Sequence, residues 1–259
     1  MEIISTMEAV LYEPRGDCVI ITLNRPEQRN AIDSSMRRGL FEAFARFESD
    51  EQARVAILTG SGDRAFCAGA DLKEMSEQRL AVLPPGYFPV LGDNVHLTKP
   101  VIAAVNGDAF AGGWMFAQMC DLCVSSRTAR FGITEAKVGR GFPWAAPLIH
   151  MIPQRIMTEL LMTGRPITAQ RAYEIGFVNR LAEPAEVLEE SLKLAEEIAS
   201  CAPLTVAAAK QLVALSTDVG RTAALSAATS VFERVYSSED AQEGPRAFRE
   251  KRRPVWKNR

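Results

Sequence analysis

Two turns rich in small residues could place backbone N–H groups where they would bind an anionic oxygen. One leads to Ala70 and the other to Gly112, and each follows an apolar run. Small residues let a ligand approach the backbone closely, and a helix N-terminus favours negative charge. Two N–H groups aimed at one oxygen form an oxyanion hole, in which each donor lowers the barrier by on the order of 3 kcal/mol. Either turn taken singly is better explained by tight packing of a helix against a strand.

Each turn is expected to open a helix. Asp71 is a favourable N-cap residue, and Glu74 stands three residues later, as in a capping box, which predicts a helix that begins after Ala70. The segment 114–120 after the second turn is the other expected helix. Both helix dipoles would then add positive potential at the N–H groups of the two turns.

Two other catalytic patterns find little support. Residues 60–65 match the dinucleotide fingerprint G-x-G-x-x-A after an apolar run. However, a small-residue turn follows where a long amphipathic helix is required, and a second strand ending in an acid is missing at the proper distance. A Ser-His-Asp hydrolase is also disfavoured, because the sequence has no G-x-S-x-G elbow and neither His96 nor His150 lies in a motif.

Composition indicates a globular protein with one large domain or a domain plus an extension. The chain has 259 residues, of which 47% are hydrophobic and 24% charged, and its net charge is −2. That balance argues against a nucleic-acid partner, since the basic residues cluster only near the C-terminus. We see neither a secretory signal nor an apolar stretch long enough for a membrane span, and we expect a cytoplasmic protein.

The five cysteines are expected to be reduced and buried. Cys120 and Cys123 form a C-x-x-C pair, but a second pair is lacking and the chain has only two histidines. A zinc site is therefore not expected, and the pair is interpreted as two small apolar side chains.

Apolar runs and helical spacing predict an α/β fold whose second half is helical. We expect an α/β core over residues 1–195 and a helical region over 196–259. The expected strands are 19–23, 55–59, 101–105 and 122–125, and the expected helices are 33–51, 154–163, 168–175, 185–202, 204–216 and 221–235.

The ordered motifs along nearly the whole chain resemble the crotonase superfamily, also called the enoyl-CoA hydratase/isomerase family. This resemblance implies ββα turns stacked into a spiral and closed by C-terminal helices. It implies acyl-CoA substrates, with coenzyme A entering as part of the substrate and no separate cofactor or metal. It also implies homotrimers, often paired as dimers of trimers. The matching motifs are Asn24-Arg25-Pro26, Asn30-Ala31, 66–74, 100–121, 131–139, 161–164, Ala172, Gly176 and 248–252.

The resemblance assigns roles to particular positions. Ala70 and Gly112 become the oxyanion-hole donors, and Glu135 becomes the acid/base. One group of residues would bind coenzyme A near the oxyanion hole: Ala68, Arg29, Asp71 and Leu72. A second group would bind it, often from a neighbouring subunit: Phe232, Phe248 and Lys251. The Lys251 ammonium suits a nucleotide phosphate. The acyl pocket would be shaped by Met115, Phe142 and Trp144 together with Asp108 and Phe110, and residues 80–94 would form a mobile wall.

The sequence departs from the hydratase pattern at two places. Hydratases of this family hold water with two glutamates, and Met115 occupies the position of one of them. The loop that is glycine-rich in hydratases carries Phe142, Pro143 and Trp144, which indicates a drier pocket. Glu135 alone would suffice to move a proton along a conjugated acyl chain, so we favour double-bond isomerisation. Hydration or dehydration with reduced or altered activity, and a non-catalytic CoA- or RNA-binding protein, are the alternatives.

Overall fold

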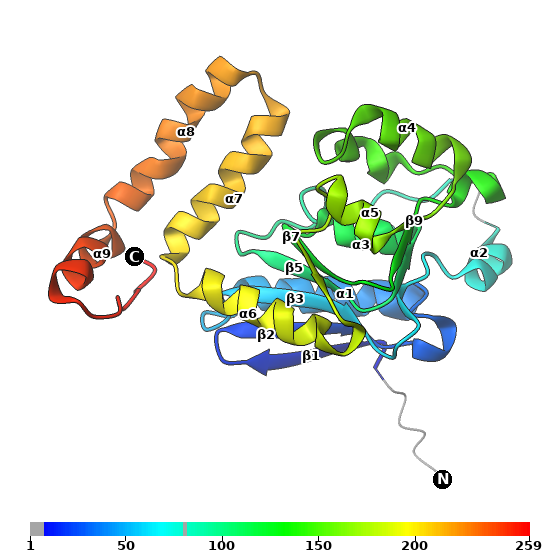
Figure 1. Ribbon diagram of the computed structural model, residues 1–259, viewed down its shortest axis with the longest axis horizontal. Coiled ribbons are helices and arrows are strands. Elements are labelled where there is room, and N and C mark those ends of the chain that lie inside the picture. Colours follow the sequence, from blue (N-terminus) through cyan, green and yellow to red (C-terminus); the bar gives the residue numbers. More distant parts are fainter. Residues whose placement is uncertain (1–7, 80–81) are drawn as a thin grey trace, which may run out of the picture.

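A six-stranded sheet forms the centre of the computed structural model, which describes residues 8–79 and 82–259 (Figure 1). The strand order is β1-β2-β3-β5-β7-β10. The pairs from β2 to β10 are parallel, whereas β1 is antiparallel to β2. The bounds are β1 Val10–Arg15, β2 Cys18–Leu23, β3 Val55–Gly60, β5 Val101–Val105, β7 Leu122–Ser126 and β10 Arg180–Ala182.

A second sheet of short strands lies at the ends of the first. Its order is β4-β6-β8-β9, and each of β4, β6 and β8 directly follows a strand of the large sheet. The chain therefore repeats strand, short strand and connecting segment, which is the expected ββα spiral. The bounds are β4 Ala65–Cys67, β6 Asp108–Phe110, β8 Arg130–Gly132 and β9 Ile167–Thr168.

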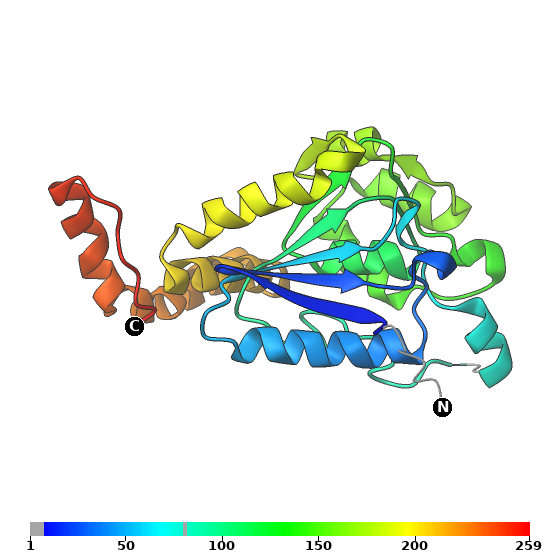
Figure 2. The ribbon, with the colours of Figure 1, turned by 90° about the horizontal axis from the view of Figure 1, so that it is seen from below.

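Helices cover both faces of the large sheet, which explains why its strands are continuously apolar. Figure 2 shows α1 (Ser34–Ser49) and α6 (Val187–Ala199) on opposite sides of the strands. Met36, Leu40 and Phe44 of α1 are fully buried against one face, and Val187 of α6 packs against the other. Helix α3 (Gly112–Met119) is buried along nearly its whole length and inserts between the two sheets.

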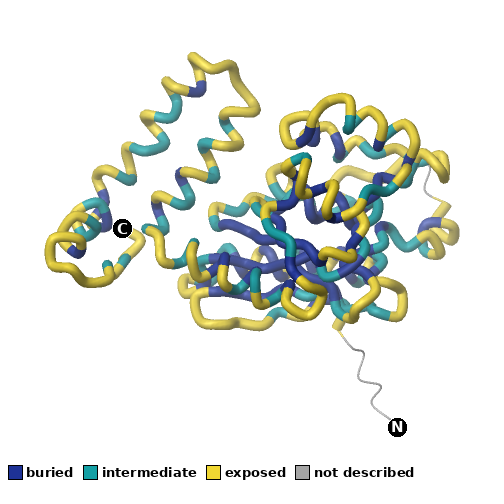
Figure 3. The backbone as a smooth tube through the Cα atoms, viewed as in Figure 1, coloured by how far each residue is buried: buried dark blue, intermediate teal, exposed yellow. Residues whose placement is uncertain are grey.

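The C-terminal helices form an arm that leaves the body, as expected for a helical extension. Figure 1 shows α7 and α8 side by side, pointing away from the sheets, with α9 beyond the lower end of α8 at the left of the view. Figure 3 shows that few residues of this arm are buried. The remaining helices are α2 Leu72–Gln78, α4 Gln154–Thr163, α5 Ala169–Glu174, α7 Pro203–Asp218, α8 Arg221–Tyr236 and α9 Glu239–Glu250, with 3-10 helices η1 Pro26–Gln28, η2 Glu135–Val138, η3 Pro143–His150 and η4 Pro184–Glu186.

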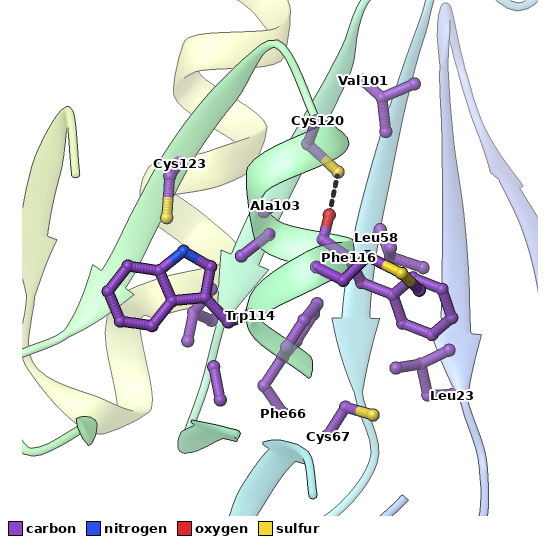
Figure 4. Close-up of a cluster of buried hydrophobic side chains, with 14 of the residues drawn as sticks. Leu23, Leu58, Phe66, Cys67, Val101, Ala103, Trp114, Phe116, Cys120 and Cys123 are labelled. Atoms are coloured by element: carbon purple, nitrogen blue, oxygen red, sulfur yellow. Dashed lines mark hydrogen bonds between the residues drawn. The ribbon is translucent and has the colours of Figure 1, made fainter. Parts of the chain in front are cut away.

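The cysteines correct one expectation. All five are free thiols, and four are buried, but Cys201 is exposed because it lies where the chain leaves the core between α6 and α7. Cys120 donates a hydrogen bond to the Phe116 carbonyl (3.2 Å, Figure 4), and burial raises its pKa. Over residues 8–79 and 82–259, no group of three or more His, Cys, Asp or Glu side chains could hold a metal ion.

Within the described ranges, no single helix has the length and apolarity to cross a membrane. Two consecutive helical segments, residues 184–199 and 203–218, are together long and apolar enough by length and composition alone, but the chain bends by 108° between them.

Candidate active site

The backbone on both sides of Ala70 is fixed by hydrogen bonds to a neighbouring segment. The N–H of Ile32 donates to the Gly69 carbonyl (2.8 Å), and the N–H of Asp71 donates to the Ile32 carbonyl (3.0 Å). These bonds form an isolated parallel bridge between Ile32 and Ala70. In this pairing the N–H of Ala70 points away from Ile32, and no acceptor in the described part of the chain receives it. The donor is therefore available to a ligand.

Half of the predicted capping box is confirmed. The Asp71 carboxylate accepts hydrogen bonds from the N–H groups of Lys73 and Glu74 and caps α2. The other half is wrong, because the Glu74 carboxylate does not return to Asp71. It accepts from the N–H of Ser34 (2.9 Å) and pairs with Arg37 (2.7 Å), so it joins α2 to α1 instead.

Gly112 is the first residue of α3, where a helix leaves its N–H groups without intrahelical acceptors. Ala111 before it has φ 52° and ψ −117°, a left-handed conformation that is unfavourable for a residue with a Cβ. That conformation is held because the Ala111 N–H donates to the Gly132 carbonyl (2.8 Å) and its carbonyl accepts from Met115 (3.1 Å). The N–H of Gly112 has no acceptor among residues 8–79 and 82–259.

The two turns lie against each other. A Cβ placed on Gly112 would lie 3.7 Å from the Ala70 nitrogen, and one on Gly69 would lie 3.3 Å from the Gly112 nitrogen. A Cβ on Gly113 would lie 2.0 Å from the Cys67 carbonyl oxygen, so only glycine lets α3 pack this closely on β4. Two available donors thus sit in adjacent, tightly packed turns, as an oxyanion hole requires.

Glu135 supplies a half-buried carboxyl group at the start of η2. Its Oε2 atom is buried and has no hydrogen-bond partner in the described structure. Burial raises the pKa of this carboxyl, while the backbone N–H groups of Glu135 and Thr134 and the indole of Trp144 oppose the rise. A carboxyl group with a raised pKa and a free oxygen is suited to general acid–base chemistry.

A buried glutamine ties α3 to the loop that carries Trp144. The side-chain Nε2 of Gln118 donates to the Trp144 carbonyl (2.9 Å), and its Oε1 has no partner among the described residues. Met115, one turn earlier on α3, is 2% exposed. Phe142 and Trp144 are partly buried and pack against the main core. Sequence reasoning missed Gln118, because a polar residue inside an apolar helix carries no local signal for its partner.

Asp108 and Phe110, which were expected to shape the acyl pocket, both face Arg130. The Asp108 carboxylate pairs with the Arg130 guanidinium (2.5 Å), which also lies over the Phe110 ring at 5.5 Å. Of the expected wall at 80–94, residues 80–81 lie outside the described structure. The rest contains no helix, and the Tyr87 ring lies under Arg37 at 3.9 Å. The mobility of this wall stays a prediction.

The structure brings together some of the residues assigned to coenzyme A and separates others. The Ala68 N–H donates to the Arg29 carbonyl (3.0 Å), and both lie near Ala70, as do Asp71 and Leu72. A second group lies on the arm at the far end of the molecule from α2 in Figures 1 and 2. That group consists of Phe232 on α8, Phe248 on α9 and Lys251 directly after α9. Its binding role therefore stays a prediction for a neighbouring subunit.

Replacing Trp144 by Phe should move the acid limb of the kcat/KM profile to higher pH. The indole favours the charged form of Glu135, so its removal should raise the pKa of that carboxyl further. A pH–rate profile measures the shift. Trp256→Phe is the matched control, because the Trp256 indole donates to the Ser200 carbonyl (2.8 Å) on the arm. An acid limb at the same pH in Trp144→Phe as in wild type would contradict the effect of the indole on the pKa of Glu135. An equal shift in Trp256→Phe would contradict it as well.

Comparison with known proteins agrees with this architecture. The family model "Enoyl-CoA hydratase/isomerase" matches residues 15–259. The chain is 41% identical to a carnitinyl-CoA dehydratase from Proteus mirabilis over 254 residues, which cover 95% of this chain and 97% of the relative. It is 40% identical to a carnitinyl-CoA dehydratase from Salmonella typhi over 261 residues, covering 97% and 99%.

Solved structures show the same likeness in three dimensions. An enoyl-CoA hydratase from Mycobacterium tuberculosis H37Rv matches with a TM-score of 0.90 and 40% identity, covering 98% of this chain and 100% of that one. An enoyl-CoA hydratase from Mycobacterium marinum matches with a TM-score of 0.91 and 38% identity over the same shares. With the crotonase fold, two adjacent N–H donors and a half-buried glutamate in place, the chain belongs to the enoyl-CoA hydratase/isomerase family of enzymes.

Proposed function

We propose that this enzyme forms a thioester enolate and moves a carbon–carbon double bond along an acyl-CoA chain. The Ala70 and Gly112 N–H groups hold the thioester oxygen, and Glu135 is the single acid/base. One observation carries the proposal: the half-buried Glu135 has a buried oxygen with no hydrogen-bond partner among the described residues. Position 115, where the family resemblance implies a second glutamate in hydratases, is a buried methionine.

The proposed reaction needs one carboxylate. Glu135 takes a proton from C2 of a 3-enoyl-CoA, and the electron pair moves onto the thioester oxygen as an enolate. The two N–H donors stabilise that charge as it develops. The enolate then collapses while Glu135 returns its proton to C4, which leaves a 2-enoyl-CoA. Proton and electrons balance without a second group or an added reactant.

A direct assay compares three substrates at matched chain length. Wild-type protein should convert a 3-enoyl-CoA to the 2-enoyl-CoA faster than it hydrates the 2-enoyl-CoA or dehydrates a 3-hydroxyacyl-CoA. Fast hydration of the 2-enoyl-CoA would overturn the preference for isomerisation. Binding of all three thioesters without turnover would instead identify a protein that binds coenzyme A derivatives but does not catalyse.

The second candidate is dehydration of a hydroxyacyl-CoA, which the names of the relatives favour. The chain is 41% identical to proteins named carnitinyl-CoA dehydratase. Glu135 could remove the C2 proton in such an elimination, but the departing hydroxyl also needs a proton, and a thioether at position 115 cannot supply one. Dehydration of a 3-hydroxyacyl-CoA that outpaces isomerisation would establish this candidate.

Replacing Met115 by Glu should raise hydration of a 2-enoyl-CoA at least about tenfold relative to isomerisation. The new carboxylate would supply the water-activating base that the chain lacks, a contribution typically worth about 10²- to 10⁴-fold. Met115→Gln is the control, because it has nearly the same shape and polarity but cannot ionise. An equal gain in both variants would show that polarity alone, rather than a second base, changes the ratio. Thermal denaturation checks that both buried substitutions fold.

We also propose that the chain assembles as a homotrimer or a dimer of trimers. The arm carries large apolar side chains that one copy leaves exposed: Val213, Leu225, Tyr236 and Phe248. Light scattering after gel filtration measures the assembly. A monomeric mass at micromolar concentration would reject this proposal and would leave the coenzyme A roles of Phe232 and Lys251 without a neighbouring subunit.

A further inference from the structure

We propose that Arg25 is a positioning residue that fixes the Ala70 half of the oxyanion hole. The inference rests on the proposed function, because it assumes that the Ala70 N–H binds the thioester oxygen. Arg25 follows β2 and is far from Ala70 in the sequence.

The Arg25 guanidinium joins two segments that run side by side. Its Nη1 donates to the Ala31 carbonyl (2.6 Å) and to the Asp71 carboxylate (3.1 Å), and its Nη2 pairs with the Asp33 carboxylate (3.2 Å). The side chain is 19% exposed. These are charge-assisted hydrogen bonds in a largely enclosed setting, which makes them stronger than surface pairs.

Both carboxylates are themselves anchored to helix N-termini. Asp71 caps α2 through Oδ1 and pairs with Arg25 through Oδ2. Asp33 caps α1 through Oδ1, which accepts from the N–H of Met36 (2.8 Å), and pairs with Arg25 through Oδ2. One arginine thus holds the starts of two helices in a fixed relation, and Ala70 lies directly before one of them.

The electrostatics of Asp71 agree with this arrangement. Burial by itself would raise the pKa of its carboxyl, but the pKa is lowered because the hydrogen bond from Glu74 N–H and the Arg25 guanidinium outweigh burial. Asp71 therefore stays charged. Asp71 also donates its own N–H to the Ile32 carbonyl (3.0 Å), so a shift of its side chain is transmitted to the strand-like bridge at Ala70.

Loss of Arg25 should reduce the stabilisation of the transition state more than it reduces the affinity for the substrate. A donor displaced by about 1 Å costs about 100-fold in rate, while distant anchoring contacts to the substrate are unchanged. We expect Arg25→Met to lower kcat about 10- to 100-fold with KM changed less than about threefold. Arg25→Lys can restore one ion pair but not the fork of three bonds, so its kcat should lie between those of wild type and Arg25→Met.

Arg37→Met is the matched control. Arg37 is 9% exposed and also connects α1 to α2, through its pair with Glu74 (2.7 Å). Its guanidinium bonds to Glu74 rather than to the carboxylates of Asp71 and Asp33, and its contact with Asp33 is the backbone hydrogen bond within α1, which the substitution leaves in place. If Arg25 only packed the two helices together, both variants would lose the same amount of kcat for the same loss of thermal stability. A larger kcat loss in Arg25→Met at equal thermal stability supports the positioning role, and equal losses overturn it.

A spectroscopic measurement separates this inference from the proposed function. Cinnamoyl-CoA is a chromophoric thioester whose absorption shifts to longer wavelength when its carbonyl is polarised, and it has no C4 hydrogen to be moved. Wild type and Arg37→Met should shift its absorption on binding, and Arg25→Met should shift it less. An equal shift in all three proteins rejects the role of Arg25 alone. No shift in the wild-type protein rejects the oxyanion hole and with it the proposed function.

Discussion

Glu135→Gln is expected to lower kcat for the acyl-CoA reaction about 10²- to 10⁴-fold with little change in KM. The substitution keeps the shape of the side chain but removes the group that accepts and returns the proton. Steady-state assays with the 3-enoyl-CoA measure the loss. Glu159→Gln on the exposed face of α4 is the control for a lost carboxylate elsewhere. Turnover retained in Glu135→Gln would remove Glu135 from the mechanism.

The same variant should become more stable than wild type as pH rises. Burial raises the pKa of Glu135 in the folded protein, so folding favours the protonated carboxyl. Wild type therefore loses stability as pH rises from the unfolded-state pKa of about 4.3 through the raised folded-state pKa. Gln does not titrate, so the stability gain should be absent below about pH 4 and present at neutral pH. Thermal denaturation of both proteins across this pH range measures the difference in stability. A difference that shrinks as pH rises would contradict the raised pKa of Glu135 in the folded protein.

Gly112→Pro is expected to lower kcat about 10²- to 10³-fold, because it deletes one proposed donor to the oxyanion. Proline is tolerated at the first position of a helix, where its fixed φ suits the helical turn. It also disfavours the positive φ of Ala111 before it, so circular dichroism must show that the variant folds. The readouts are kcat with the 3-enoyl-CoA and the absorption shift of bound cinnamoyl-CoA, which should be smaller than in wild type.

Gly112→Ala is the matched control for the added bulk. It keeps the N–H, and its Cβ would lie 2.8 Å from Cδ1 of Ile32, the end of a flexible side chain. Its kcat should therefore fall less than that of Gly112→Pro. Equal losses in the two variants, with the fold checked by circular dichroism, would show that crowding rather than the missing donor limits the reaction.

The elements that the sequence predicted well are those whose pattern is local. The strands at 19–23, 55–59, 101–105 and 122–125 are continuous apolar runs because helices cover both faces of the sheet. The short strands of the second sheet escaped prediction, since three residues carry no periodicity and their partners lie far along the chain. Helix α9 lies in the region predicted to be helical, but its own range was not predicted, because it is largely polar and contains Pro245.

The candidate site divides in the same way. Ala70, Gly112 and Glu135 were predicted as site residues because small-residue turns and family motifs are recognisable in short stretches of sequence. Arg25 lies in one of those motifs, but neither its contacts nor those of Gln118 were predicted, because their partners are set by tertiary structure: Asp71 is 46 positions from Arg25, and Trp144 is 26 positions from Gln118. The sequence therefore named the groups proposed to react, and the fold was needed to find the contacts proposed to position them.

The close packing of Gly113 on β4 has a consequence for mutational tolerance. The two proposed donors are main-chain atoms, so among single substitutions only proline can delete either one. The glycine beside them tolerates no side chain, since even a Cβ would lie 2.0 Å from the Cys67 carbonyl oxygen. Met115, two residues further on, is a side-chain position with no such backbone restriction. Substitutions can therefore change the side chains that determine which reaction occurs, while the backbone donors proposed to polarise the carbonyl are retained. Sequence differences within the family should concentrate at side-chain positions such as 115.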